Sequence, residues 1–115
     1  MSEFDHAVEM DVVLYPEGNV WIAQGLQFDV TARGESPAQA SDRFDLKIGV
    51  ELLMSLELDD EAPLSDVGRA PEKFWRMFKT AKMTFEKEPT PIRITDGSRT
   101  AKVHARMKIS DQEAS

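Results

Sequence analysis

The amino-acid sequence predicts an α+β fold in which an antiparallel β-meander carries a helix packed on one face. Three observations predict it: apolar and polar residues alternate in two stretches, turn residues separate the apolar runs, and a capped segment of helical period follows. A second amphipathic helix and a C-terminal β-hairpin complete the prediction. Because the chain has 115 residues, we expect a single domain, residues 1–115.

The meander is expected from about residue 10. Its first strand has apolar residues at every second position: Val8, Met10, Val12 and Leu14. Residues 16–19 contain Pro, Gly and Asn and therefore predict a turn. The β-forming run of residues 20–23 then completes a hairpin, and alternation over residues 27–33 predicts a third strand.

The first helix is predicted from its start signals and its period. Ser36 can accept a hydrogen bond at the N-cap, Pro37 suits the first helical position, and Gln39 can complete a capping box. Every fourth residue is then apolar: Ala40, Phe44, Ile48 and Leu52. We expect this helix to lie on one face of the meander and to end near residue 58, in a loop that runs to about residue 70.

The second half predicts a helix over residues 71–87 and a hairpin over residues 91–109. Aromatic residues lie along one side of this helix: Phe74, Trp75, Phe78 and Phe85. Such a stripe usually belongs to a core, and the alternative is that part of it forms an oligomer interface. In the hairpin, two short runs of β-forming residues flank a turn at Asp96, Gly97 and Ser98.

Composition restricts the classes of function. The chain has no cysteine, which excludes disulfides, thiolate zinc sites and cysteine nucleophiles. No apolar run approaches the roughly 20 residues that span a bilayer. The N-terminal segment is acidic, unlike the start of a signal peptide. We therefore expect a cytoplasmic protein with no membrane contact.

The charges are divided between the two halves. Residues 1–65 hold 14 acidic and 3 basic residues, whereas residues 66–115 hold 7 acidic and 11 basic ones. Two solvated surfaces that complement each other within the fold explain this division most simply. The alternatives are chains that pair with each other and separate partners for the two halves. Nucleic acid is not expected as a partner unless the basic C-terminal half contacts it.

No residue pattern predicts catalysis. His6 and His104 are far apart in the sequence, and no phosphate-binding loop or Ser-His-Asp pattern is present. A metal-dependent nuclease of the ribonuclease H type is the enzymatic alternative, with four candidate ligands: Asp11, Asp29, Asp42 and Asp45. On the predicted strands Asp11 and Asp29 lie opposite the apolar face, away from the helix. We therefore expect no catalytic residue, metal or cofactor.

The passage from the third strand to the first helix contains, in order, Thr31, Gly34, Ser36, Gln39 and Ala40. This order is similar to the passage T-x-G-x-[ST]-x-x-E-A of the HicB-like antitoxin domain, which residues 19–40 resemble. There is one extra residue before Gly34, and Gln39 stands where the family has Glu. The resemblance covers residues 10–58. It implies a partial ribonuclease H fold without its catalytic acids.

The same resemblance implies a function. HicB-like proteins commonly neutralise a small RNA-cleaving toxin and self-associate, and many carry a C-terminal DNA-binding segment. Here residues 69–78 instead resemble a segment of an uncharacterised bacterial group, and they show neither a helix-turn-helix nor a ribbon-helix-helix pattern. That departure separates the second half of the chain from the family.

We therefore predict a non-catalytic HicB-like protein-binding domain, an antitoxin that occludes a basic toxin. The acidic residues predicted to bind the partner are Glu9, Asp11, Asp29, Glu57, Asp59, Asp60 and Glu61. The alternatives are a homo-oligomer that acts without a toxin, joined by the aromatic stripe or a sheet edge, and the nuclease described above.

Overall fold

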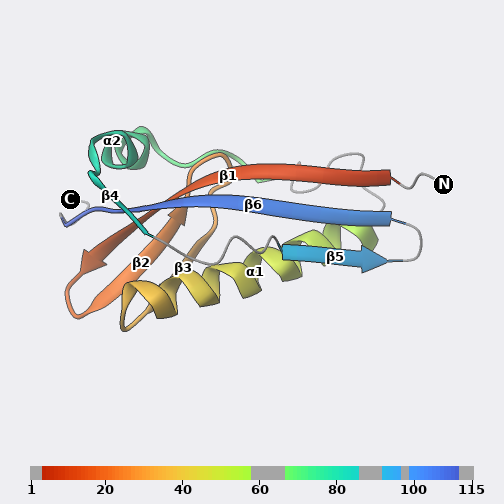
Figure 1. Ribbon diagram of the computed structural model, residues 1–115, viewed down its shortest axis with the longest axis horizontal. Helices are drawn as coiled ribbons and strands as arrows, with labels where there is room; N and C mark the ends of the chain where they lie inside the picture. The colour runs from red at the N-terminus through yellow and green to blue at the C-terminus, as the bar shows by residue number, and fades with distance from the viewer. Residues whose placement is uncertain (1–3, 58–66, 86–91, 97–98, 112–115) are drawn as a thin grey trace.

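The computed structural model describes residues 4–57, 67–85, 92–96 and 99–111, and within these the side chains of residues 9–54, 67–85 and 105–111. The fold is α+β, as predicted. A mixed sheet has the strand order β3-β2-β1-β6-β4, and β5 also pairs with β6. Helix α1 (Pro37–Glu57) and helix α2 (Glu72–Thr80) pack on opposite faces of this sheet (Figure 1).

The predicted meander is confirmed. Strands β1 (Phe4–Glu17) and β2 (Val20–Gly25) are antiparallel, with Glu17 paired to Val20 across a two-residue turn. Gly18 adopts a φ of 62° in this turn, a conformation that a residue with a Cβ adopts only at a cost. Strand β3 (Thr31–Gly34) continues the meander antiparallel to β2.

The third strand is shorter than predicted. We expected it over residues 27–33, but residues 26–28 form a bend, and Asp29 precedes the strand instead of lying in it. Two local backbone hydrogen bonds hold this bend, from Gly25 N to Val30 O at 2.9 Å and from Val30 N to Phe28 O at 2.8 Å. These bonds replace the ladder that the alternating pattern predicted.

Helix α1 begins as its sequence signals predict. Gln39 N donates to Ser36 Oγ at 3.1 Å, and the Gln39 side chain accepts from Glu35 N at 2.7 Å. The four apolar residues of the predicted stripe are all buried against the sheet: Ala40, Phe44, Ile48 and Leu52. They form one core with alternate residues of β1 (Met10, Val12 and Leu14) and with Met107. The α1 face of the sheet therefore carries the largest apolar layer.

Strand β6 (Arg99–Ile109) lies inside the sheet, with β1 parallel to it on one side and β4 and β5 antiparallel to it on the other. The sequence predicted this strand but not its pairing with β1. The register pairs Asp11 with Arg106 and Val12 with Met107. Met107 is buried in the same core as Phe44, and its sulfur accepts a hydrogen bond from Ser41 at 3.1 Å. The N-terminal meander and the C-terminal strand therefore form one structural unit.

Helix α2 ends earlier than predicted. We expected a helix over residues 71–87, but α2 ends at Thr80, and β4 (Met83–Thr84) pairs with β6. Phe85 N donates to Met107 O at 2.9 Å. Residues 83–85 therefore pair with the edge of β6 and do not continue the helix. As a consequence Phe85 packs in the core on the α1 side, away from the aromatic residues of α2.

Strand β5 (Ile92–Asp96) pairs antiparallel with β6, in register from Asp96 and Arg99 to Ile92 and Val103. The turn between them, at residues 97–98, lies outside the described residues, so the C-terminal hairpin as a whole stays a prediction. Over the part of the chain that the structure describes, neither helix is long and apolar enough to cross a membrane.

Candidate functional site

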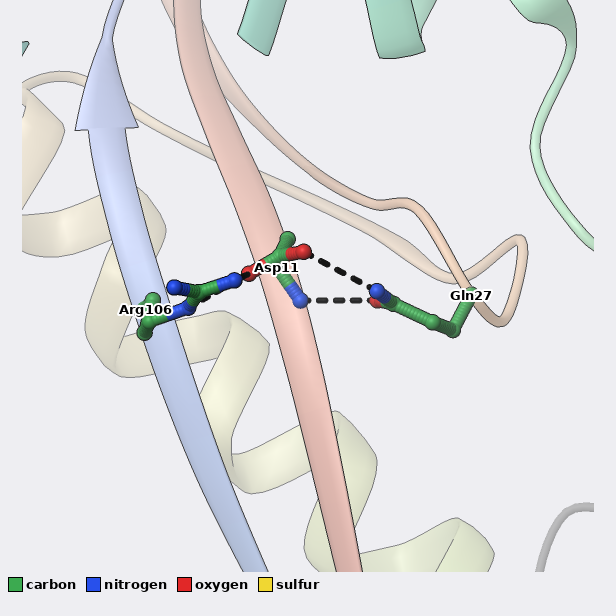
Figure 2. A network of polar contacts seen from close by, with 3 residues as sticks. All are labelled: Asp11, Gln27 and Arg106. Atoms are coloured by element: carbon green, nitrogen blue, oxygen red, sulfur yellow. Dashed lines mark hydrogen bonds and ion pairs between the residues drawn. The ribbon is translucent and has the colours of Figure 1, made fainter. Parts of the chain in front are cut away.

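A polar network centred on Asp11 joins β1, β6 and the bend after β2 (Figure 2). Gln27 binds Asp11 twice: its Oε1 accepts from the Asp11 backbone N–H at 2.7 Å, and its Nε2 donates to Oδ2 at 3.0 Å. Arg106 approaches the other carboxylate oxygen, Oδ1, with Nε at 2.8 Å and Nη2 at 2.7 Å. Both oxygens of Asp11 therefore accept hydrogen bonds from within the chain.

The fold positions each member of this network. Asp11 and Arg106 are partners in the parallel register of β1 and β6, so their side chains leave the same face of the sheet. Gln27 reaches Asp11 because β2 ends at Gly25 and the chain then bends. Sequence reasoning identified Asp11 and missed both of its partners. Finding Arg106 required the pairing of β1 with β6, which no local pattern shows.

Exposure divides the network into two parts. The Asp11 side chain is 14% exposed and that of Arg106 is 79% exposed. Because water and salt screen the exposed guanidinium, the ion pair itself contributes little to stability, about 1 kcal/mol or less. The bidentate contact with Gln27 is the more protected part. It closes the edge of β1 at the point where β2 stops.

Asp29 is held by hydrogen bonds to its side chain and from its backbone. Gln24 is buried, and its Nε2 donates to Asp29 Oδ1 and to Gly25 O, both at 2.8 Å. The Asp29 backbone N donates to Gly68 O at 2.7 Å. The Asp29 residue is nevertheless exposed, so its carboxylate lies fixed at the surface, where a partner can reach it.

The other predicted acidic residues lie apart from this network. Glu9 is exposed on β1, two residues before Asp11, and its register partner is His104 of β6. Glu57 is the last residue of α1, with its side chain outside the described part. Residues 59–61 lie outside the described residues altogether. The structure therefore brings Glu9 and Asp11 onto one face of β1 and leaves the 57–61 cluster as a prediction.

The aromatic residues of α2 pack on the sheet face opposite α1. Phe74 is buried and stacks on Tyr15 with 5.7 Å between ring centroids. Trp75 donates from Nε1 to Ala70 O at 3.1 Å, and Arg69 lies over its ring at 4.3 Å. These contacts are those of a core. A partner contact at the remaining exposed surface of Trp75, and at Phe78 or Phe85, stays a prediction.

Basic side chains cover the rings of this α2 cluster. Lys108 of β6 lies 4.6 Å from the centroid of Phe78, and Lys73 lies 5.1 Å from that of Phe74. Cations above aromatic faces stabilise such sites by about 0.5–1 kcal/mol when exposed. Part of the basic charge of the second half is therefore engaged with the chain's own aromatic residues. Contact of nucleic acid with the rest stays a prediction.

Three of the four candidate metal ligands lie on two sides of the sheet, and the fourth, Asp29, lies between β2 and β3. Met10 and Val12 face α1, so Asp11 between them faces the opposite side, whereas Asp42 and Asp45 belong to α1 itself. Among the residues that the structure describes, no three His, Asp or Glu side chains are grouped closely enough to hold a metal ion. The nuclease alternative stays a prediction, which assays of divalent-metal-dependent cleavage of RNA and DNA test.

Tyr15 is buried beneath α2, and its environment changes its titration. Burial of the phenol, and secondarily the negative charge of Glu17, raises the pKa of Tyr15 from 10.0 to about 12. The folded state therefore binds this proton more tightly than the unfolded state does. Its contribution to stability is complete below about pH 10 and is lost as the pH rises toward about 12.

We expect the free energy of unfolding to fall by about 3 kcal/mol between those pH values, since one pKa unit corresponds to about 1.4 kcal/mol. Tyr15 is the only tyrosine, so ultraviolet titration of the phenol reports on it alone. The Tyr15→Phe variant, followed by denaturant unfolding over the same range, should lack this part of the loss. A phenol that titrates near pH 10 in the folded protein would contradict the expectation.

No protein-family model, curated protein or solved structure matches this chain. The resemblance of residues 10–58 to HicB-like domains accordingly stays a prediction.

Proposed function

We propose that this chain is a non-catalytic, HicB-like protein-binding domain, an antitoxin that binds and occludes a small, basic, RNA-cleaving toxin. One observation carries the proposal: β1 continues for about half its length beyond the end of β2, and no described strand pairs with that part of its edge. Exposed acidic residues lie next to this edge. The β-meander that resembles the HicB-like domain supplies the edge.

The open edge begins at Asp11. Strand pairing with β2 covers β1 from Val12 to Glu17, and the last backbone bond runs from Leu26 N to Asp11 O at 2.9 Å. Toward the N-terminus, residues 4–10 pair with β6 on one side, and no described strand lies on the other. An unpaired strand edge is a template on which an extended segment of a partner can add.

The backbone at Glu9 is directed toward this edge. Asp11 presents both its N–H and its C=O to the β2 side, where Gln27 and Leu26 bind them. Strand geometry repeats every two residues, so the N–H and C=O of Glu9 point the same way, beyond the reach of β2. Glu9 is thus the first residue whose backbone a partner strand would bind.

The charges beside the edge favour a basic partner. The chain carries a net charge of −7, and Glu9 and Asp29 are exposed. A complementary basic surface would be steered toward this side of the sheet and covered by it, which would hide a toxin's RNA-binding residues. The carboxylate of Asp11 is already bound by Gln27 and Arg106, so its part is to fix the start of the edge.

A homo-oligomer in which two β1 edges pair with each other is the second candidate, because the same open edge could serve a second copy. The two candidates differ in what the edge binds. Expression with the adjacent genes, followed by purification through the chain and identification of what is retained, separates them. Consistent absence of a small basic protein would reject the antitoxin version.

Substitutions at Glu9 test the edge. Glu9→Pro removes the N–H that faces the open side, a position where proline is tolerated in a strand, and should leave the fold intact. We expect it to weaken partner binding about tenfold or more, which corresponds to about 1.4 kcal/mol. The matched control Glu9→Ala keeps the N–H and should lose only the effect of the charge. Asp29→Lys reverses the charge at the neighbouring bend and also removes the acceptor of the hydrogen bond from Gln24 Nε2, so it tests the charge and the bend together.

Titration calorimetry with the purified partner measures these differences, and circular dichroism confirms that each variant is folded. If Glu9→Pro binds as tightly as Glu9→Ala, strand addition at β1 is wrong. If Asp29→Lys and Glu9→Ala also bind like the original chain, the acidic surface is not the binding surface either.

A further inference from the structure

The outer side of α1 carries a second apolar stripe that the core does not use. Leu46 is 72% exposed, Val50 56%, Leu53 39% and Met54 49%, whereas the core residues of the same helix are fully buried. These four residues recur at intervals that place them on one side of a helix. Large apolar side chains grouped in this way on a soluble surface usually mark an interaction site.

Among the described elements, none covers this stripe. The sheet lies against the opposite side of α1, and α2 packs on the other face of the sheet (Figure 1). The stripe on α1 and the open edge of β1 are separate surfaces. Binding at the stripe is therefore independent of the proposed function.

The spacing of the stripe fits a paired helix. Leu46, Val50 and Leu53 are separated by four and then three residues, the alternation of a heptad seam, with leucine at both d positions and valine at the a position between them. A β-branched residue at a with leucine at d favours two parallel strands. We infer that this stripe is a self-association surface, on which α1 of a second copy packs parallel and in register.

The charges at the g and e positions agree with this arrangement, and Glu57, at the following a position, ends the seam. In a parallel pair, a residue at g faces the residue at e of the partner helix five positions later. Asp42 occupies g and Lys47 occupies e, so each pair of helices would bring two opposite charges together at both sides of the seam. In an antiparallel pair g faces g and e faces e, and these two side chains would not meet.

The two basic residues next to the seam, Arg43 and Lys47, both contact the backbone of β3. Arg43 occupies the preceding a position, but its Nη1 donates to Arg33 O at 3.1 Å, which turns it toward β3 and away from a second helix. Lys47 Nζ donates to Thr31 O at 2.9 Å. An ammonium has three donors, so two remain for a carboxylate of another copy. Asp42 is exposed, and a carboxylate that already has a partner can accept a further hydrogen bond.

Sedimentation of the full chain over a range of concentrations tests the surface. We expect a species of twice 13.0 kDa that dissociates on dilution. Val50→Asp should sediment as a monomer at every concentration. The matched control is Met83→Asp, because Met83 is 60% exposed and lies on β4, outside the stripe; it should dimerise as the original chain does. Circular dichroism confirms folding of both variants.

The parallel register is tested by crosslinking and by charge. The chain has no cysteine, so Leu46→Cys introduces a single thiol, which should form a disulfide with its equivalent only if the helices are parallel and in register. Lys47→Asp should weaken the dimer, and combining it with Asp42→Lys should restore it. A chain that is monomeric at all concentrations, or a Val50→Asp variant that still dimerises, would overturn the inference. A dimer that neither crosslinks through Leu46→Cys nor regains strength in the double variant would overturn the parallel arrangement.

Discussion

Replacing Phe44 with alanine should lower the free energy of unfolding by about 3–5 kcal/mol. Phe44 is fully buried in the core between α1 and the sheet, beside Met10, Val12 and Met107. Its ring also approaches Gly25, where a Cβ would lie 3.2 Å from Cζ. Because strands from both ends of the chain meet around this ring, neighbouring side chains can only partly fill the cavity that its loss would leave.

Denaturant unfolding of Phe44→Ala and Phe44→Leu measures this cost. The leucine variant keeps an apolar side chain of moderate size and should lose less than about 1.5 kcal/mol. Domains of this kind are stable by about 5–15 kcal/mol, so the alanine variant should be close to unfolding at ordinary temperature. Equal and small losses for both variants would show that Phe44 is not central to the core.

Gly34→Ala is expected to have the second largest effect, a loss of about 2–4 kcal/mol. A Cβ on Gly34 would lie 2.5 Å from Ala40 N and 2.8 Å from Gln39 C, which are backbone atoms of the first turn of α1. Backbone cannot rotate away as a flexible side chain can. The start of the helix would have to move, and the hydrogen bond from Gln39 N to Ser36 Oγ would weaken with it.

The matched control is Gly68→Ala, where no atom lies within 4 Å of the added Cβ. Without a clash, this substitution should leave stability unchanged or raise it by about 0.4–1 kcal/mol, because alanine has less freedom in the unfolded chain. Thermal unfolding followed by circular dichroism compares the two variants. A Gly34→Ala protein as stable as the Gly68→Ala protein would show that the contact between β3 and α1 is looser than described.

Local sequence patterns predicted the elements that local interactions form. Alternation placed β1, a run of β-forming residues placed β2, and the four-residue apolar period placed α1 against the sheet. The cap at Ser36 was found where Ser, Pro and Gln follow one another in order. Fold class could therefore be predicted from the sequence alone.

The errors came from long-range pairing. The aromatic period over residues 71–87 is helical, yet residues 83–85 join β6, because strand hydrogen bonds to the chain's own sheet outweigh a marginal helical preference. The alternation over residues 27–33 likewise predicted a strand at Gln27. In the structure the Gln27 side chain instead binds Asp11, 16 residues earlier. The candidate site was incomplete for the same reason: Arg106 reaches Asp11 across 95 residues of sequence.

The parallel pairing of β1 with β6 has a consequence for synthesis. A ribosome releases β1 well before β6, because paired residues such as Asp11 and Arg106 lie 95 positions apart in the sequence. Until β6 emerges, one edge of β1 and the apolar face that receives Met107 have no native neighbour. Pairings over such sequence distances form slowly. The nascent chain therefore carries an unpaired edge of β1 until β6 has emerged, and such an edge favours aggregation during that interval.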